Sequence, residues 1–310
     1  GSGADASSAT ATNEITLGDS SITSLRIPGL QSGASDGQVL TYNSTNGDIE
    51  LADAGGGGAS AINDLSDAVT NSSGESIGLG TGALANDDGS SNKNTAVGYQ
   101  AANALTTGSL SVAVGYQALK TATTDHSNVA LGYQAMVNST ASESIAIGRV
   151  AQRKSTANSN ISVGYFSHYD LTSGGSNIAI GNSAGANQTT GNDNVVLGTG
   201  AHGAATTANQ NVAIGSRALD SVTTIGACTA IGYEALESFT GTSILGYATA
   251  IGYQAANSMT TPYHVTAIGY SVASNATTGG TASVLIGSGA AAALTTGGGN
   301  TCVGHESLQL

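Results

Sequence analysis

The sequence is poor in the residues that build an ordinary globular core. Its 310 residues include no Trp, 2 Phe and 2 Pro, against 45 Gly. A conventional globular core built on aromatic side chains is therefore not expected. Charged residues make up only 9% of the chain, whereas disordered polar chains usually carry many charges. Low charge together with regularly spaced aliphatic residues predicts an ordered repeat protein.

Basic residues are also scarce. The chain has 7 Lys and Arg against 20 Asp and Glu, which gives a net charge of −13 and a pI of about 4.4. The basic residues are scattered apart from one small group, Arg149, Arg153 and Lys154. Nucleic-acid binding needs a concentrated positive surface, so we expect no nucleic-acid partner. No apolar run approaches the ~20 residues that span a bilayer, so we expect no membrane insertion.

The few cysteines and histidines do not form a recognisable site. Cys228 and Cys302 lie 74 residues apart at two different repeat positions, which argues against an intrachain disulfide or a metal site. We expect no metal and no cofactor. The histidines share no repeat position either: they are His126, His168, His202, His264 and His305.

One octapeptide recurs along the chain. NTAVGYQA at Asn94 returns as SVAVGYQA at Ser111 and NVALGYQA at Asn128. Alignment on its glycine gives fourteen copies with a mean spacing of about 17 residues. The aligned glycines are Gly80, Gly98, Gly115, Gly132, Gly148, Gly164, Gly181, Gly198, Gly215, Gly232, Gly252, Gly269, Gly287 and Gly304.

Each copy predicts one short strand followed by a bend. Val, Ile or Leu precedes every glycine, Val, Ile or Thr stands three residues before it, and a small residue, usually Ala, lies between them. This alternation of period two predicts a strand with one β-branched face and one small-residue face. The small-residue face is expected to pack closely against another chain. The glycine marks a bend at positive φ, after which we expect a second strand.

Two polar positions also repeat. Thr stands eight residues after the glycine in twelve of thirteen copies, and we interpret this series as a ladder at a strand end or turn rather than an ice-binding face. A second ladder of stacked amides is predicted four residues before the glycine. Its members are Asn94, Asn128, Asn160, Asn177, Asn194, Asn211 and Asn300.

These features predict an all-β chain that forms a parallel β-roll or solenoid of about 14 coils. A coil of this length cannot bury its own apolar face, whereas stacked coils can, at ~4.8 Å per coil. The intervals of 16 to 20 residues vary between the Thr and the next strand, so this segment forms a variable edge.

The repeats resemble the head repeats of YadA-like trimeric adhesins, whose signature reads roughly Asn-Ser-Val-Ala-Ile-Gly, and their long GYQAL variant in bacteriophage tail fibres. The resemblance covers residues 76–310 in fourteen tandem copies. It implies a left-handed parallel β-roll in which three identical chains pack around an axis. The expected function is that of a structural virion fibre, a phage tail fibre that attaches to a host cell.

The resemblance leaves the biological setting open. The alternative is the head of a bacterial trimeric autotransporter adhesin at the bacterial cell surface. An ice-binding β-solenoid and a depolymerase rank below both of these functions. As a virion protein on an extracellular particle, the chain would assemble into a homotrimer. Its other partners would be virion or tail proteins and a host-cell surface receptor. Carbohydrate is one option for that receptor.

The first 75 residues do not carry the repeat. Residues 1–54 are expected to form a small β module with a hairpin turned at Thr45-Asn46-Gly47. Residues 55–75 are expected to form a Gly-rich linker and a lead-in. In the lead-in, Ile62, Leu65 and Val69 have the spacing of a short helix, although a simple extended lead-in remains the alternative.

No catalytic residue is predicted, and the chain is not expected to be an enzyme. Carboxylates occur without the recurring facing pair that glycoside cleavage requires, so we interpret them as single surface charges. They are Asp125, Glu143, Asp170, Asp193, Asp220, Glu234 and Glu237.

Any receptor contact is expected on the variable edge, where insertions differ between coils. The longest interval, Gly232 to Gly252, and the coil after it supply the candidates Tyr247, Tyr263 and His264, with a structural bulge as the alternative. Tyr also follows the corner glycine in seven copies. Two consecutive triplets predict aromatic ladders, which either meet sugar rings or pack at the corner and between subunits.

Overall fold

The computed structural model describes residues 38–42, 49–53, 68–70, 75–90, 92–240, 246–277 and 282–309. The chain divides into two units, residues 1–60 and 61–310. In the first unit, β1 (Gln38–Tyr42) and β2 (Ile49–Asp53) pair antiparallel, as expected for the predicted hairpin. Its turn and the rest of the expected N-terminal module lie outside the described residues.

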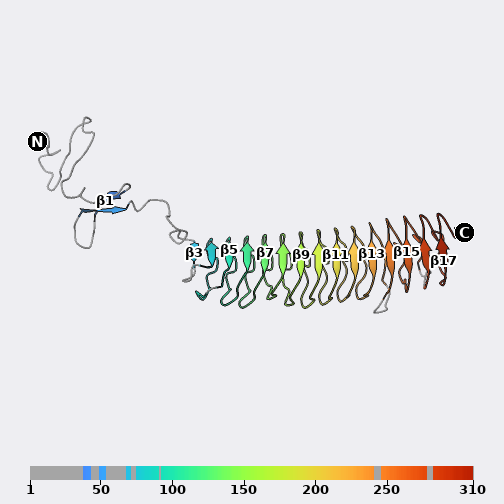
Figure 1. Ribbon diagram of the computed structural model, residues 1–310, viewed down its shortest axis with the longest axis horizontal. Coiled ribbons are helices and arrows are strands. Elements are labelled where there is room, and N and C mark those ends of the chain that lie inside the picture. Colours follow the sequence, from blue (N-terminus) through green and yellow to red (C-terminus); the bar gives the residue numbers. More distant parts are fainter. Residues whose placement is uncertain are drawn as a thin grey trace, which may run out of the picture. The chain divides into compact units, whose positions relative to one another are not determined.

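The second unit is a parallel β-solenoid, as predicted, and its fourteen parallel strands agree with the expected number of about 14 coils. A three-residue strand ends directly before each aligned glycine, and Figure 1 shows these strands as one row of parallel arrows. The strands are β4 (Ile77–Leu79), β5 (Thr95–Val97), β6 (Val112–Val114), β7 (Val129–Leu131), β8 (Ile145–Ile147), β9 (Ile161–Val163), β10 (Ile178–Ile180), β11 (Val195–Leu197), β12 (Val212–Ile214), β13 (Thr229–Ile231), β14 (Thr249–Ile251), β15 (Thr266–Ile268), β16 (Val284–Ile286) and β17 (Thr301–Val303).

One further strand precedes the parallel stack. β3 (Ala68–Thr70) pairs antiparallel with β4, with Val69 opposite Gly78. Val69 therefore lies in a strand and not in the short helix suggested by its spacing from Ile62 and Leu65. Residues 61–67 lie outside the described part of the chain.

The strands stack in register, and the face that points inward differs from the one expected. The central small residue of each strand pairs with its counterpart in the next coil, as Ala96 pairs with Ala113 and Ala113 with Ala130. These alanines are buried within the single chain. The expectation that a lone chain exposes the small-residue face is therefore wrong. The small side chains face the interior of their own coil, where the narrow space favours them, although Val196 and Leu285 are buried at the same position in two coils.

The chain after each corner glycine does not form the expected second strand. In the coil of Gly98, Gln100 and Ala102 have φ of 52° and 47°, in the left-handed region, so the backbone turns repeatedly instead of forming a pleat. Its amides still bond to the next coil, with N–H of Ala102 donating to O of Ala118 at 2.9 Å. These hydrogen bonds offset the cost of the left-handed residues.

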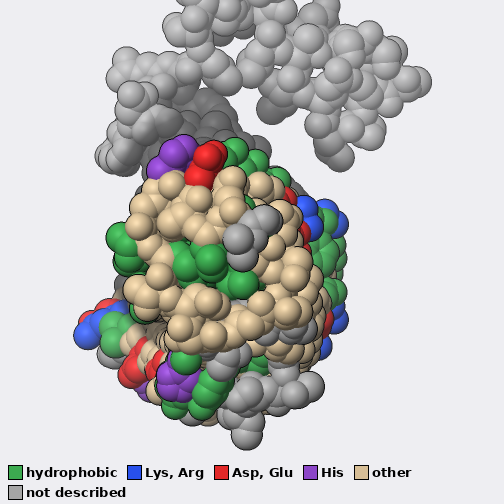
Figure 2. Space-filling view, turned by 90° about the vertical axis from the view of Figure 1, so that its right-hand side faces the viewer, with side chains coloured by type: hydrophobic (Ala, Val, Ile, Leu, Met, Phe, Trp, Pro, Cys, Tyr) green, Lys and Arg blue, Asp and Glu red, His purple; other side chains and the backbone are tan. Residues whose placement is uncertain are grey.

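The core is a narrow column of small and medium-sized side chains. The strand alanines face a second buried series, such as Ala101, Ala118 and Ala135, with Leu119 and Met136 filling the remaining space. In the end-on view, hydrophobic side chains are visible inside the ring of backbone (Figure 2). Phe239 is the largest of the fully buried side chains, and Ala, Leu and Met fill most of the rest, so this core is built without Trp.

The predicted Asn ladder is confirmed and has a defined structural role. The side chain of Asn177 is buried, and its Oδ1 accepts a hydrogen bond from the backbone N–H of Asn194 at 3.0 Å. Its Nδ2 donates to the carbonyl oxygen of Gly191 at 2.8 Å, fourteen residues later in the same coil. The same two bonds recur at Asn94, Asn128, Asn160, Asn194 and Asn211, so each of these residues closes its own coil and joins it to the next. Asn300, in the last coil, instead donates to O of Gly297.

The Thr series forms the turn ladder that the sequence predicts. Oγ1 of Thr172 donates to O of Thr189 at 2.9 Å, and Oγ1 of Thr189 donates to O of Thr206 at the same distance. Their backbone N–H groups bond to the same acceptors. These hydroxyl groups therefore serve the stacking of coils.

Candidate functional site

The three predicted receptor-contact residues lie together on the surface. The ring centroids of Tyr247 and Tyr263 are 6.4 Å apart, those of Tyr247 and His264 are 5.1 Å apart, and those of Tyr263 and His264 are 4.1 Å apart. All three side chains are exposed. Tyr247 and His264 each stand five residues before a corner glycine, Gly252 and Gly269, so coil stacking places one above the other. Their binding to a receptor stays a prediction.

The two predicted tyrosine ladders are present at the corner. Tyr99, Tyr116 and Tyr133 stack with ring centroids 5.3 and 5.2 Å apart, and their side chains are 43–45% exposed. The second ladder has the same geometry and comprises Tyr233, Tyr253 and Tyr270. Because an inner ring is covered on both faces by its neighbours, these ladders present mainly ring edges and hydroxyl groups to solvent.

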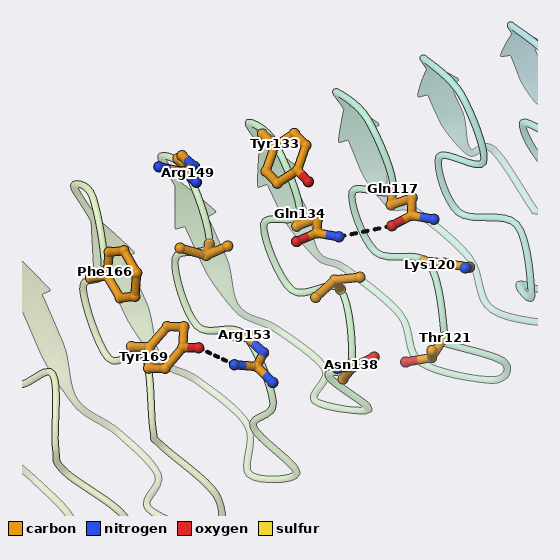
Figure 3. Close-up of a pocket in the computed structure, with 12 residues that line it drawn as sticks. Gln117, Lys120, Thr121, Tyr133, Gln134, Asn138, Arg149, Arg153, Phe166 and Tyr169 are labelled. Atoms are coloured by element: carbon orange, nitrogen blue, oxygen red, sulfur yellow. Dashed lines mark hydrogen bonds between the residues drawn. The ribbon is translucent and has the colours of Figure 1, made fainter.

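A basic, aromatic pocket lies beside the first ladder (Figure 3). We call it the basic pocket. Four consecutive coils, those of Gly115, Gly132, Gly148 and Gly164, build it around a cavity of about 450 Å³. Its lining residues are Gln117, Lys120, Thr121, Tyr133, Gln134, Val137, Asn138, Arg149, Val150, Arg153, Phe166 and Tyr169.

The charge of the basic pocket is uncompensated. No carboxylate lines it, and its cations Lys120, Arg149 and Arg153 have no ion pair within the described residues. Every other described Lys or Arg lies within 4.0 Å of a carboxylate: Lys93 beside Glu75, Lys154 beside Asp170, and Arg217 beside Asp220, Glu234 and Glu237. The unpaired cations of the described chain therefore gather in one place.

Aromatic rings orient the two arginines of the pocket. The guanidinium carbon of Arg149 lies 5.7 Å from the ring centroid of Tyr133 and 5.3 Å from that of Tyr165. Arg153 lies 4.8 Å from the ring centroid of Tyr169, and its Nη1 donates to the hydroxyl of that residue (Figure 3). Cation–π contacts hold a guanidinium in place without neutralising it. Both arginines keep their charge available to a ligand.

Sequence reasoning missed this pocket, although one signal pointed to it. Arg149, Arg153 and Lys154 stood out as a basic group, but Lys154 belongs elsewhere, with its Nζ 2.8 Å from Asp170. Lys120 completes the pocket from two coils away, and only the stacking of coils brings it near. The pocket also lies on the corner side and not on the variable edge where ligand contact was expected.

The interpretation of the carboxylates as single surface charges is wrong for four of them: Asp170 pairs with Lys154, and three others gather around Arg217. Asp220 and Glu234 lie 3.7 and 3.2 Å from Arg217 nitrogens, and Glu237 contacts its Nη2. Stacking brings these residues together from neighbouring coils. A hydrogen bond from Gln254 is the main cause that holds the pKa of Glu234 below its usual range. The positive charge of Arg217 partly compensates the three carboxylates. These carboxylates therefore do not form a facing pair of free acids.

Comparisons with protein-family models, curated proteins and solved structures found no match. In the described ranges, no helix has the length and apolar character that crossing a membrane requires. Among the same residues, His, Cys, Asp and Glu side chains nowhere gather in a group of three or more that is arranged to hold a metal ion.

Proposed function

We propose that this chain is part of a homotrimeric fibre that attaches a virion to a host cell, as bacteriophage tail fibres do. The observation that carries the proposal is the unbroken parallel ladder from β4 to β17. Hydrogen bonds between neighbouring coils make a stiff stack. At ~4.8 Å per coil, this stack is roughly 65 Å long. Such a stack holds contacts at a distance, and three copies of a weak contact bind by avidity.

The outer face of the sheet supports self-association. The two outward side chains of each strand are β-branched or leucine residues, and many are more than one third exposed; Val114, Ile147 and Ile180 are 37%, 38% and 41% exposed. Repeated over fourteen strands, they form a long and mainly apolar face, whose polar members are Thr95, Thr229, Thr249, Thr266 and Thr301. Exposed apolar surface of this extent is typical of protein–protein interfaces. In the proposed trimer this face, and not the small-residue face, packs against the other chains.

We expect light scattering on the purified chain to give three times its mass of 30.1 kDa. Ile147→Lys together with Ile180→Lys should reduce the measured mass to that of one chain, because two charges would be buried in the apolar interface. Thr190→Lys together with Thr207→Lys adds the same two charges at exposed turns away from that face and should leave the trimer intact. A stable wild-type monomer at micromolar concentration would contradict the homotrimer.

The aromatic patch on the variable edge is the proposed receptor contact. Replacing Tyr247, Tyr263 and His264 with Ser should weaken binding to host cells about tenfold or more, because exposed aromatic clusters dominate many interfaces. Binding of labelled protein to a panel of bacterial cells measures the effect, with melting temperature as a check on the fold. Tyr253→Ser with Tyr270→Ser removes two aromatic rings from the corner instead and should change binding little. Unchanged binding of the triple variant would assign the receptor contact elsewhere.

The genes around the reading frame distinguish the two biological settings. Tail and baseplate genes beside it would support the virion fibre. A reading frame with a signal peptide and a membrane β-barrel anchor would instead support the head of a bacterial trimeric autotransporter adhesin. Both settings use the same solenoid for attachment.

A further inference from the structure

We propose that the basic pocket binds an acidic sugar unit, a pyranose with a carboxylate group, within an oligosaccharide. The site is separate from the patch of Tyr247, Tyr263 and His264. The assignment of this ligand to the basic pocket does not depend on the proposed attachment function. Only the inference that the glycan belongs to a host-cell surface rests on that function.

The charge of the pocket calls for an anionic ligand. The chain has a net charge of −13 and repels anions as a whole, so an anion would bind only where positive charge is locally uncompensated. The basic pocket meets this condition, because Lys120, Arg149 and Arg153 lack carboxylate partners among the described residues. The guanidinium groups of Arg149 and Arg153 present paired N–H donors in the planar geometry that matches a carboxylate.

The remaining lining favours a sugar over a bare anion. Tyr133, Phe166 and Tyr169 provide apolar ring surface beside the cations, as the apolar face of a pyranose requires. The amides of Gln117 and Gln134 offer both donors and acceptors for hydroxyl groups, and a hydrogen bond of 2.9 Å between them fixes their orientation (Figure 3). The cavity of about 450 Å³ lies within the range of small-ligand sites.

The spacing of the cations indicates a ligand longer than a single ion. Lys120 and Arg153 occupy the same position in coils that are two steps apart, which separates their backbones by roughly 10 Å at ~4.8 Å per coil. A single carboxylate could contact both Lys120 and Arg153 only if the two side chains bent toward each other. An oligosaccharide can place its acid group at the arginines and a hydroxyl or a second acid group at Lys120. An extended nucleic-acid backbone would need a stripe of cations instead of one compact pocket.

Calorimetric titration of the full chain with three probes tests the assignment. The probes are a uronic-acid tetrasaccharide, a neutral tetrasaccharide of the same linkage, and inorganic phosphate. We expect the acidic tetrasaccharide to bind at least tenfold more tightly than either other probe, with affinity that falls as salt is raised. Equal binding of the acidic and neutral probes, binding of phosphate as tight as that of the acidic probe, or no binding at all would overturn the proposal.

Variants of neighbouring residues provide the matched comparison. Arg149→Gln and Arg153→Gln should each weaken binding of the acidic tetrasaccharide at least tenfold, and Lys120→Gln by a smaller factor. Lys154→Gln makes the same change of charge beside Arg153, but this lysine pairs with Asp170 outside the lining and should leave the affinity unchanged. If Lys154→Gln and Arg153→Gln lost the same affinity for the acidic tetrasaccharide, binding would depend only on net charge, and the proposed site would be wrong. Lys120 has no aromatic cation–π contact among the described residues, so its variant remains informative if an arginine variant folds poorly.

Discussion

Gly215→Ala should lower the free energy of unfolding by about 2 to 6 kcal/mol per chain. Gly215 has a φ of +131°, a conformation that costs a residue with a side chain about 1–3 kcal/mol. An added Cβ would also lie 2.3 Å from the carbonyl oxygen of Gly232 and 2.5 Å from its carbonyl carbon. Relieving this overlap adds about 1–3 kcal/mol, as in other overpacked sites.

The overlap is severe because the neighbouring atoms belong to backbone. Gly232 occupies the same corner position in the next coil, so no flexible side chain can move aside. Its N–H donates to O of Ile214 at 2.7 Å, and the N–H of Gly215 donates to O of Leu197 at the same distance. The methyl group therefore forces apart two coils that these hydrogen bonds hold together. This requirement explains why the corner position is glycine in every coil that another coil follows; Gly304, in the last coil, shares only the positive φ, +129°.

Gly200→Ala is the control for this prediction. Gly200 also has a positive φ, +64°, but an added Cβ would come no closer than 3.8 Å to another residue, at Cγ of Arg217. The coils of Gly115 and Gly132 have Gln117 and Gln134 at the same position with φ of 54°. We expect its unfolding free energy to change by less than about 1 kcal/mol. Chemical denaturation compares the two variants, and equal stability of Gly215→Ala and wild type would show that the corner tolerates a side chain.

The regular part of the fold could be predicted from the sequence because each position in a coil meets its own counterpart in the next. The strand pattern, the corner glycines and the Asn and Thr ladders all follow from that repetition. Which strand face points inward did not follow. Ala96 and its counterparts suit a narrow core and a close contact between chains equally well, and only the closed path of the coil places them inside.

The remaining differences come from neighbours that are distant in sequence. The segment after each corner has no second strand because residues such as Gln100 and Ala102 are left-handed, which their side chains do not signal. The basic pocket and the cluster around Arg217 combine residues from several coils. Reading the sequence in columns of about 17 residues would have placed Lys120 and Arg153 on one column, but their lack of carboxylate partners is visible only in the structure.

Acidification provides the second large expected effect, through two histidines inside the solenoid. His168 and His202 each stand four residues after a corner glycine, in the inward column that holds Leu119 and Leu219 elsewhere, and both are fully buried. Oγ of Ser162 lies 2.8 Å from Nδ1 of His168.

Their hydrogen bonds suit neutral rings. Nδ2 of Asn211 lies 3.3 Å from Nε2 of His202 and donates to it, so protonation of that nitrogen would set two donors against each other. Nε2 of His168 has no hydrogen-bond partner among the described residues. A proton added there would find no acceptor among the described residues to compensate for the loss of water.

Burial lowers the pKa of His168 from 6.5 to about 3, with a smaller contribution from His202, and lowers the pKa of His202 to about 4. In the unfolded chain both would titrate near their ordinary pKa of about 6.5. Stability is therefore fully present above pH 6.5. It falls as the pH drops toward the folded pKa values, because only the unfolded chain then takes up the protons.

At pH 5 each buried histidine should cost about 2 kcal/mol relative to pH 7, and the pair about 4 kcal/mol. Denaturation curves at pH 7, 6 and 5 measure this loss. In the variant His168→Leu with His202→Leu, which carries the side chain found at this position in other coils, most of the loss between pH 7 and 5 should disappear. The exposed His126, His264 and His305 remain in that variant and control for surface titration. If the double variant kept the full pH dependence, acid sensitivity would arise outside the core, and the imidazoles would not be held neutral by burial.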